Sequence, residues 1–417
     1  MGCTDLAGMR FLLSTIGSRG DVQPLVALAS ELRALGEDVH LCVPPDFREW
    51  IEGLGMPVTP IGPELRSMGK ARPVAGITPE QRRQMIEGTV AAQFQTISAA
   101  ARDRDAIVGA TALQIAAPSV AEGMGIPYVF AAYCPTVLPS KHHAPPVLVS
   151  LGDTAPLAVE DYSQHWARDT QRWNDAWRPP LNAQREVLGL APIDDVRGHV
   201  LTNRPWLAAD ATLGPWPDPA DANVFQTGAW ILPDHRPLTP EIEAFLDAGD
   251  PPVYFGFGSV GAPENISRVM IESARAVGRR SIVLRGWAEL PLIDDAADCL
   301  SIGEVNQQML FKRVAAVVHH GGAGTTTAAA RAGAPQVVIA QHYDQPYWAH
   351  RVHQLGIGTA LASATPSVES LTSALARTLE PIVATQARSV AAEMRGDGAS
   401  IAARRLIDEA VGDPGAG

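Results

Sequence analysis

Short apolar runs alternate with amphipathic stretches along the first third of the chain. Runs of strand length fall at residues 9–16, 39–43, 57–61, 106–110 and 127–132. Helical spacing of apolar positions covers the intervening segments at residues 21–35, 46–54, 79–101 and 112–124. Continuous apolar strands that alternate with helices are typical of a parallel sheet covered on both faces. The pattern therefore predicts a doubly wound α/β unit.

The same alternation restarts after a different middle section. Residues 134–160 are rich in proline and predict a surface loop, and 161–188 have helical character. Proline and glycine gather again at 214–220 and 230–240. Beyond them, strands are expected at residues 252–257, 281–285, 299–302, 314–318 and 336–340, with helices at 264–278, 306–312, 325–332 and 345–355.

Two such blocks predict two domains. We expect an N-terminal domain over residues 9–227, a linker over 228–250, a C-terminal domain over 251–394 and a final helix over 395–411. Ligands of doubly wound sheets bind outside the carboxyl ends of the strands. A site is therefore expected in a cleft between the two domains.

Composition narrows the classes of function. The chain has 417 residues, 46% of them hydrophobic, and a formal net charge of −12. An acidic protein of this kind is not expected to bind nucleic acid or anionic membrane nonspecifically. No apolar run approaches the roughly 20 residues of a membrane helix, so membrane insertion is not expected. The four cysteines are scattered, which favours reduced thiols in a cytoplasmic protein.

The most informative segment is VVHHGGAGTTTAAARAGAPQVVIAQHYDQP at residues 317–346. An apolar strand ends at two histidines, a glycine loop follows, and three threonines open an alanine-rich helix. A helix N-terminus with small residues suits a phosphate, because its N–H groups are unpaired and its dipole is positive there. The loop is neither a P-loop nor a G-x-G-x-x-G fingerprint. Taken alone, it could also be a tight turn that binds nothing.

The segments around this loop resemble the GT-B glycosyltransferases of family 1, and most of all the bacterial enzymes that glycosylate natural products such as glycopeptide and macrolide antibiotics. Six motifs occur in the order typical of that family, namely GSRGDVQPLVALASELRALG (17–36), GFGSV (256–260), RGWAEL (285–290), GEVNQQMLF (303–311), HHGGAGT (319–325) and HYDQPYWAHRVHQLGIG (342–358). The resemblance implies two Rossmann-like domains that face a cleft, with the acceptor on the first and a nucleotide sugar on the second. It also implies inverting transfer without a metal, and a final helix that packs back on the first domain.

The resemblance assigns roles to individual residues. Asp21 corresponds to the general base that accepts the proton of the attacking hydroxyl; an aspartate here could also cap the helix. Residues expected to bind the donor diphosphate are Ser259, His319, Gly322, Gly324 and Thr325, with His319 favoured over His320. Asp344 and Gln345 are expected to contact the donor sugar, although Asp344 could instead cap a helix. The nucleoside is expected at Trp287, Glu304, Val305, Asn306 and Gln308.

The acceptor is less well defined. His142 and His143 lie in the proline-rich loop, where relatives form the acceptor wall. Trp166, Trp173 and Trp177 share one helix face and are interpreted as core, or alternatively as an aromatic wall for an apolar ligand. We expect a hydrophobic aglycone, such as a macrolide, a glycopeptide core or a terpenoid, and a donor built on uridine or thymidine.

No cofactor or metal site is expected. The triplet Asp103-Arg104-Asp105 is interpreted as a solvated turn rather than a metal site. The protein is expected to be a monomer or a homodimer whose partners are small molecules. Three other functions stay open at this stage: a sugar-nucleotide epimerase, a noncatalytic partner of the same fold and, disfavoured by the missing dinucleotide fingerprint, an NAD-dependent oxidoreductase.

Overall fold

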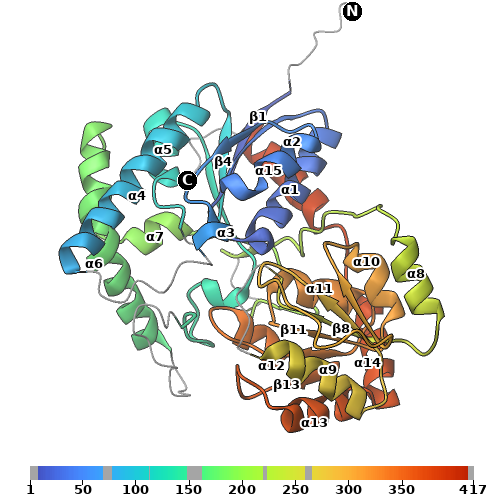
Figure 1. Cartoon of the computed structure of the whole chain (residues 1–417). Helices are drawn as coiled ribbons and strands as arrows, with labels where there is room; N and C mark the ends of the chain where they lie inside the picture. Colours follow the sequence, from blue (N-terminus) through green and yellow to red (C-terminus); the bar gives the residue numbers. More distant parts are fainter. Residues whose placement is uncertain are drawn as a thin grey trace, which may run out of the picture.

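Two parallel sheets, each covered by helices, make up the protein (Figure 1). The computed structural model describes residues 8–68, 78–111, 113–147, 162–218, 223–258 and 265–411. Along the first sheet the strand order is β3-β2-β1-β4-β5-β6-β7. Its strands are β1 (Arg10–Thr15), β2 (Asp38–Val43), β3 (Val58–Pro60), β4 (Ala106–Ala110), β5 (Tyr128–Ala132), β6 (Trp206–Leu207) and β7 (Phe225–Gln226). Helices of this half are α1 (Arg19–Ala34), α2 (Arg48–Gly53), α3 (Leu65–Met68), α4 (Pro79–Ala100), α5 (Ala117–Met124), α6 (Ser163–Val187) and α7 (Val196–Leu201).

The second sheet has the order β10-β9-β8-β11-β12-β13. Its strands are β8 (Val253–Gly256), β9 (Ser281–Leu284), β10 (Cys299–Ile302), β11 (Ala316–His319), β12 (Gln336–Val338) and β13 (Gly358–Ala360). The remaining helices are α8 (Pro240–Asp247), α9 (Ile266–Ala276), α10 (Gln307–Leu310), α11 (Ala323–Arg331), α12 (Gln345–Gln354), α13 (Val368–Thr378), α14 (Pro381–Glu393) and α15 (Gly398–Val411). The two doubly wound halves predicted from the apolar pattern are thus confirmed as a fold class.

Each sheet has one point where the chain order reverses. In the first sheet it lies between β1 and β4, and in the second between β8 and β11. His319, the last residue of β11, is in register with Gly256 at the end of β8. The glycine loop therefore starts at the switch point, which is the position where doubly wound sheets bind ligands.

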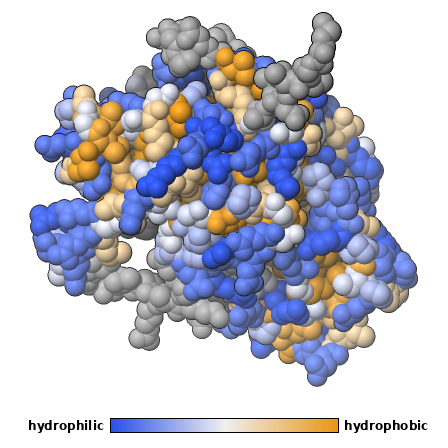
Figure 2. All heavy atoms as spheres, turned by 90° about the horizontal axis from the view of Figure 1, so that it is seen from above, coloured by the Kyte–Doolittle hydropathy of each residue, from blue (hydrophilic) through white to orange (hydrophobic). Residues whose placement is uncertain are grey.

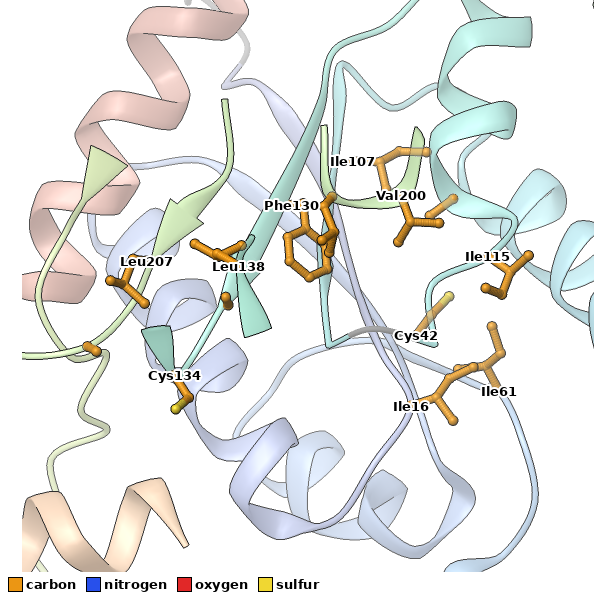
Figure 3. Packing of buried hydrophobic residues seen from close by; sticks show 14 of the residues in the cluster. Ile16, Cys42, Ile61, Ile107, Ile115, Phe130, Cys134, Leu138, Val200 and Leu207 are labelled. Carbon is orange, nitrogen blue, oxygen red and sulfur yellow. The ribbon is translucent and has the colours of Figure 1, made fainter. Parts of the chain in front are cut away.

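The largest apolar cluster joins the two halves. In the first half, Ile107, Phe130 and Val200 pack together over the sheet (Figure 3). The same cluster continues through Leu213 to Trp348 of α12. Because burial of apolar surface is the main favourable term in folding, this shared cluster binds the halves together.

The last helix, α15, lies on the first half of the chain, next to α1 (Figure 1). Ala402, Ala403 and Leu406 are buried there in a cluster with Leu25 of α1. A close backbone crossing allows this return, since a Cβ on Gly398 would lie 2.4 Å from the carbonyl carbon of Gly228.

Two segments differ from the expected pattern. Within the predicted linker, α8 and the preceding Leu238 bury apolar side chains, including Ile242 and Leu246, in a cluster of the second half. The helix expected at residues 112–124 begins only at Ala117. The Gln93 side chain hydrogen-bonds the backbone of Leu113 and Ala116, which holds this segment as a loop; residue 112 lies outside the described residues.

Candidate active site

Asp21 lies in the first turn of α1, at the carboxyl end of β1. Its carboxylate accepts hydrogen bonds from the Ser18 backbone N–H at 2.6 Å and the Ser18 hydroxyl at 3.2 Å. Ser18 is the N-cap, so Asp21 belongs to a capping box without being the cap itself. Gly17 makes room for it, because a Cβ there would lie 2.2 Å from Asp21 Oδ2.

The environment of Asp21 makes it a stronger base than a free aspartate. Burial raises the pKa of Asp21 to about 6, and the two hydrogen bonds from Ser18 oppose this shift only in part. At neutral pH the group is therefore ionised but holds a proton more readily than usual. Such a pKa suits a general base that works near neutrality.

Asp344 stands at the start of α12, on the other half of the protein. It makes no side-chain capping hydrogen bond; instead its Oδ2 accepts one from Trp348 Nε1 at 2.9 Å. Burial, and further the charge of Asp21, raise the pKa of Asp344 to about 6. Asp344 thus occupies the N-cap position of α12 without a capping hydrogen bond from its side chain. The two carboxylates are close enough to influence each other.

Gln345 and the loop before it connect the donor side to the acceptor side. The buried Gln345 accepts hydrogen bonds from the backbone N–H groups of Gln341 and His342 at 2.8 and 3.2 Å. Tyr343 has a φ of 60° and forms an isolated β-bridge with Val147. The proline-rich loop of the first half therefore touches the segment that carries Asp344.

The two histidines at the end of β11 have different surroundings. His319 is fully buried; its Nε2 bonds Gln336 Oε1 at 2.8 Å and its Nδ1 accepts from the Gly321 N–H at 3.0 Å. Burial lowers the pKa of His319 to about 4, so the ring is neutral. Both ring nitrogens are occupied within the fold, which leaves none for a diphosphate.

His320, which the sequence disfavoured, faces the glycine loop. A Cβ on Gly322 would lie 2.5 Å from His320 Nε2, and the Nδ1 atom is buried without a hydrogen-bond partner. Burial, with the neighbouring His319 and His342 adding to it, lowers the pKa of His320 to about 3. We therefore expect a diphosphate to meet His320 rather than His319, because adjacent residues at a strand end point in opposite directions.

The loop itself leaves the start of α11 open. Gly322 is the N-cap and supplies no side chain, and the space beside Gly324 is empty within 4 Å of a Cβ placed there. Thr325 is half-buried on the first turn. The first N–H groups of a helix have no intrahelical acceptor, so a diphosphate here could accept hydrogen bonds from several of them. Ser259, predicted to contribute, lies outside the described residues.

Two of the residues predicted to bind the nucleoside meet the first half of the chain. Trp287 stacks on Phe47 with ring centroids 6.1 Å apart. The exposed Glu304 forms an ion pair with Arg19 at 3.0 Å, and Arg19 also lies 3.5 Å over the ring of Trp50. The sequence singled out neither Phe47 nor Trp50, since only the fold brings them here.

The other nucleoside candidates have structural roles. Asn306 donates hydrogen bonds to the backbone carbonyls of Asp234 and Arg236 at 2.9 and 2.8 Å, and its Oδ1 caps α10. Gln308 donates to the carbonyl of Leu232 at 2.8 Å. Val305 is half-buried against an apolar cluster. The side chains of Asn306 and Gln308 therefore bond the segment that connects the halves.

On the acceptor side, His143 lies between two tryptophans. Its ring centroid is 5.9 Å from that of Trp166 and 6.0 Å from that of Trp216. Burial lowers the pKa of His143 to about 4, so the ring is neutral. His142 is exposed. Trp166 is buried, and the half-buried Trp173 and Trp177 pack against the main cluster.

Among the described residues, no group of three His, Cys, Asp or Glu side chains could hold a metal ion. In the Asp103-Arg104-Asp105 triplet, Asp105 accepts from the Arg10 N–H at 2.7 Å and Arg104 pairs with Asp38 at 2.8 Å. These contacts lie before β4, at the end of the sheet opposite to Asp21. In the described part of the chain no helix is long and apolar enough to cross a membrane. The face of the molecule in Figure 2 is largely hydrophilic, with smaller apolar patches.

Comparison with known proteins decides the family. The chain is 49% identical to the vancomycin aglycone glucosyltransferase of Amycolatopsis orientalis, over 96% of this chain and 97% of that protein. It is 50% identical to glycosyltransferase GtfE of the same organism, over 97% and 98% of the two chains. The chain belongs to the antibiotic glycosyltransferases. It is an enzyme of that class, and the resemblance of its motifs to this family is confirmed.

Family domains and solved structures agree with this assignment. Residues 11–140 match the glycosyltransferase family 28 N-terminal domain, and 288–407 match the C-terminal domain of erythromycin biosynthesis protein CIII-like proteins. The glycosyltransferase of kitacinnamycin aligns with a TM-score of 0.70 at 19% identity, over 97% of this chain and 100% of that one. VinC in complex with dTDP aligns with a TM-score of 0.64 at 22% identity, over 96% and 99%. The GT-B fold of this glycosyltransferase is therefore established.

Proposed function

We propose that this glycosyltransferase moves a sugar from a nucleoside diphosphate sugar to a hydroxyl of a glycopeptide aglycone, with inversion and without a metal. The observation that carries the acceptor class is the near-full-length similarity to a protein named as a vancomycin aglycone glucosyltransferase. A further relative, 42% identical over 92% of this chain and 93% of its own length, is named dTDP-epi-vancosaminyltransferase. Among the aglycones compatible with the sequence, the glycopeptide is thus favoured over the macrolide and the terpenoid.

Asp21 acts as the general base in this proposal. It takes the proton of the acceptor hydroxyl while that oxygen forms a bond to the anomeric carbon of the sugar. The bond from that carbon to the diphosphate breaks on the opposite face, and the configuration inverts. The raised pKa of Asp21 supports the role, since the group is ionised at neutral pH yet holds a proton well.

The negative charge that develops on the diphosphate is received at the start of α11. The first N–H groups of that helix and the side chain of His320 surround the position, and Gly322 and Gly324 let the phosphates approach. Asp344 and Gln345 contact the hydroxyls of the sugar. Trp287 and the backbone around Glu304 and Val305 receive the nucleoside, which we expect to be thymidine or uridine.

The competing functions make different predictions about these residues. An epimerase of the same fold would need no acceptor, and a noncatalytic partner would need no base. A half-buried, hydrogen-bonded carboxylate of raised pKa at Asp21 favours a catalytic role over that of a noncatalytic partner. We expect the enzyme to work in the cytoplasm, as a monomer or a homodimer.

A product assay tests the proposal. The purified protein is incubated with dTDP-glucose or UDP-glucose and with vancomycin aglycone, a macrolide aglycone or no acceptor, and products are analysed by mass spectrometry and NMR. We expect one added hexose on the glycopeptide aglycone, with anomeric configuration opposite to that of the donor, in the presence of a chelator. Transfer to the macrolide alone, retained configuration or dependence on added metal would contradict the corresponding part of the proposal.

A further inference from the structure

Helix α12 carries residues of the candidate site and also contacts the first half of the chain. Its first turn carries Asp344 and Gln345, and its middle lies against the first half of the chain. There the Arg351 side chain donates hydrogen bonds to the carbonyls of Leu213 and Thr212 at 2.8 and 3.0 Å. The helix that presents Asp344 is thus fastened to the other domain one to two turns further on.

Trp348 contacts both the first half of the chain and Asp344. It is 1% exposed and lies so close to Gly214 of the first half that a Cβ there would come within 2.8 Å of its Cη2 atom. On the other side, its indole N–H donates to Asp344 Oδ2 at 2.9 Å. An indole has a single N–H, and the direction of that N–H is fixed by the orientation of the ring. Contact with Gly214 therefore helps to decide where the Asp344 carboxylate is held.

The hydrogen bond also has an electrostatic consequence. Asp344 faces the charge of Asp21 across the domains, and burial and that charge both favour its protonated form. The bond from Trp348 opposes them and favours the ionised form. An ionised carboxylate with one oxygen already engaged leaves its other oxygen to accept a hydrogen bond from a sugar hydroxyl.

We infer that Trp348 is a positioning residue for donor-sugar recognition, and that Gly214 of the acceptor domain is part of the same arrangement. This inference rests on the proposed contact between Asp344 and the donor sugar. It adds that recognition of the sugar by the second domain depends on a packing contact supplied by the first. The second domain then binds the donor sugar tightly only when the two domains are correctly docked.

The test separates the hydrogen bond from the packing. Trp348→Phe keeps an aromatic ring at the site and removes the N–H. Binding of dTDP-glucose and of dTDP is measured by calorimetry (or of the UDP pair, if that is the donor). We expect the dissociation constant of the nucleotide sugar to rise about five- to twentyfold, as for loss of one charge-assisted hydrogen bond, and that of the free nucleotide to change less than about twofold.

Gly214→Ala tests the packing contact between the two domains. Its backbone has no positive φ, so alanine is compatible with the local conformation, but the new methyl group displaces Trp348. The same selective loss of nucleotide-sugar affinity is expected, although the substitution lies in the acceptor domain. Trp348→Phe and Gly214→Ala combined should lose little more than either alone, because both act on the same hydrogen bond.

Trp230→Phe is the matched control. Its buried indole N–H bonds Thr227 at 3.0 Å and not Asp344, so Trp230→Phe should lower stability without changing selectivity between nucleotide sugar and nucleotide. Equal weakening of both ligands in Trp348→Phe, or unchanged affinity for both, would overturn the inference. Because this test uses no acceptor, a wrong assignment of the aglycone does not affect it. A failure of the proposed sugar contact itself would appear separately, as an Asp344→Asn variant with unchanged nucleotide-sugar affinity.

Discussion

At the residue scale, two neighbouring histidines have different surroundings. His319 is locked inside the fold by Gln336 and the Gly321 N–H, whereas His320 faces the glycine loop. His319→Ala should therefore lower the free energy of unfolding by about 2–3 kcal/mol, with little change in nucleotide affinity. His320→Ala should weaken nucleoside diphosphate binding about tenfold or more, with a smaller effect on stability.

Urea unfolding and calorimetric titration with dTDP measure the two effects in parallel. The reverse pattern, with nucleotide binding lost in the His319 variant and kept in the His320 variant, would restore the original assignment. The sequence could not make this choice, because a one-residue difference at a strand end reverses the direction of the side chain. Only the register of β11 against β8 and β12 settles which histidine faces inward.

Ionisation of Asp21 should also affect how the free energy of unfolding depends on pH. Its pKa is raised in the folded protein, so ionisation costs the folded state stability, and this cost grows as the pH rises from about 4 through about 6. Asp21→Asn avoids the cost. Because the side chain is only half-buried, we expect the variant to be more stable than the wild type above pH 7 by roughly 1–2 kcal/mol, with the difference vanishing near pH 4.

Chemical unfolding of both proteins across this pH range provides the measurement. Stabilisation that is independent of pH would show that Asp21 ionises normally. A base that destabilises its own fold when charged is consistent with selection for activity at the expense of stability.

At the element scale, the short helix α10 fastens the connection between the domains. Asn306 alone provides two hydrogen bonds to that connection and one to the helix start. Asn306→Ala should lower the free energy of unfolding by about 2–3 kcal/mol, because two part-buried hydrogen bonds to backbone carbonyls and the cap of α10 are lost. Nucleotide affinity should stay within about threefold, because the Asn306 side chain bonds the connection between the halves and would affect the nucleotide only indirectly. A large loss of nucleotide affinity with unchanged stability, measured by the same two methods, would return Asn306 to the nucleoside site.

Elements with strong apolar patterns could be predicted from the sequence, and short ones could not. The strands expected at 106–110 and 299–302 coincide with β4 and β10. β6, β7 and β13, in contrast, have only two or three residues each and carry no pattern of their own. They exist because neighbouring strands offer free backbone groups. The start of α5 could not be predicted either, because the preceding loop is held by hydrogen bonds from Gln93, which is distant in the sequence.

At the scale of the whole molecule, the two halves share one apolar cluster and one returning helix. Trp348 and Leu213 belong to the same cluster, and α15 buries its alanines against the first half. We therefore expect a single cooperative thermal transition, with the calorimetric enthalpy close to the van't Hoff enthalpy. Differential scanning calorimetry without ligand would contradict this if it resolved two transitions separated by more than about 5 °C, as for independent domains.

Contacts between the halves lay beyond the reach of sequence analysis. The family motifs contain Trp287, Glu304 and Arg19, but they do not indicate that Glu304 pairs with Arg19 or that Trp287 stacks on Phe47, which comes from a distant part of the chain. Trp348 lies within the motif at 342–358, one helical turn after Asp344, but the sequence alone assigns it no role. Such pairs depend on how two domains dock, and no local pattern encodes that geometry.

The most direct test of the account is the single-turnover rate of Asp21→Asn. Wild type and variant are saturated with nucleotide sugar and mixed with the glycopeptide aglycone near pH 7.5, and product is followed by rapid quench. We predict that donor affinity stays within about twofold while the rate of transfer falls at least about a hundredfold, as expected for loss of a general base. A variant that transfers sugar at nearly the wild-type rate would remove Asp21 from the mechanism.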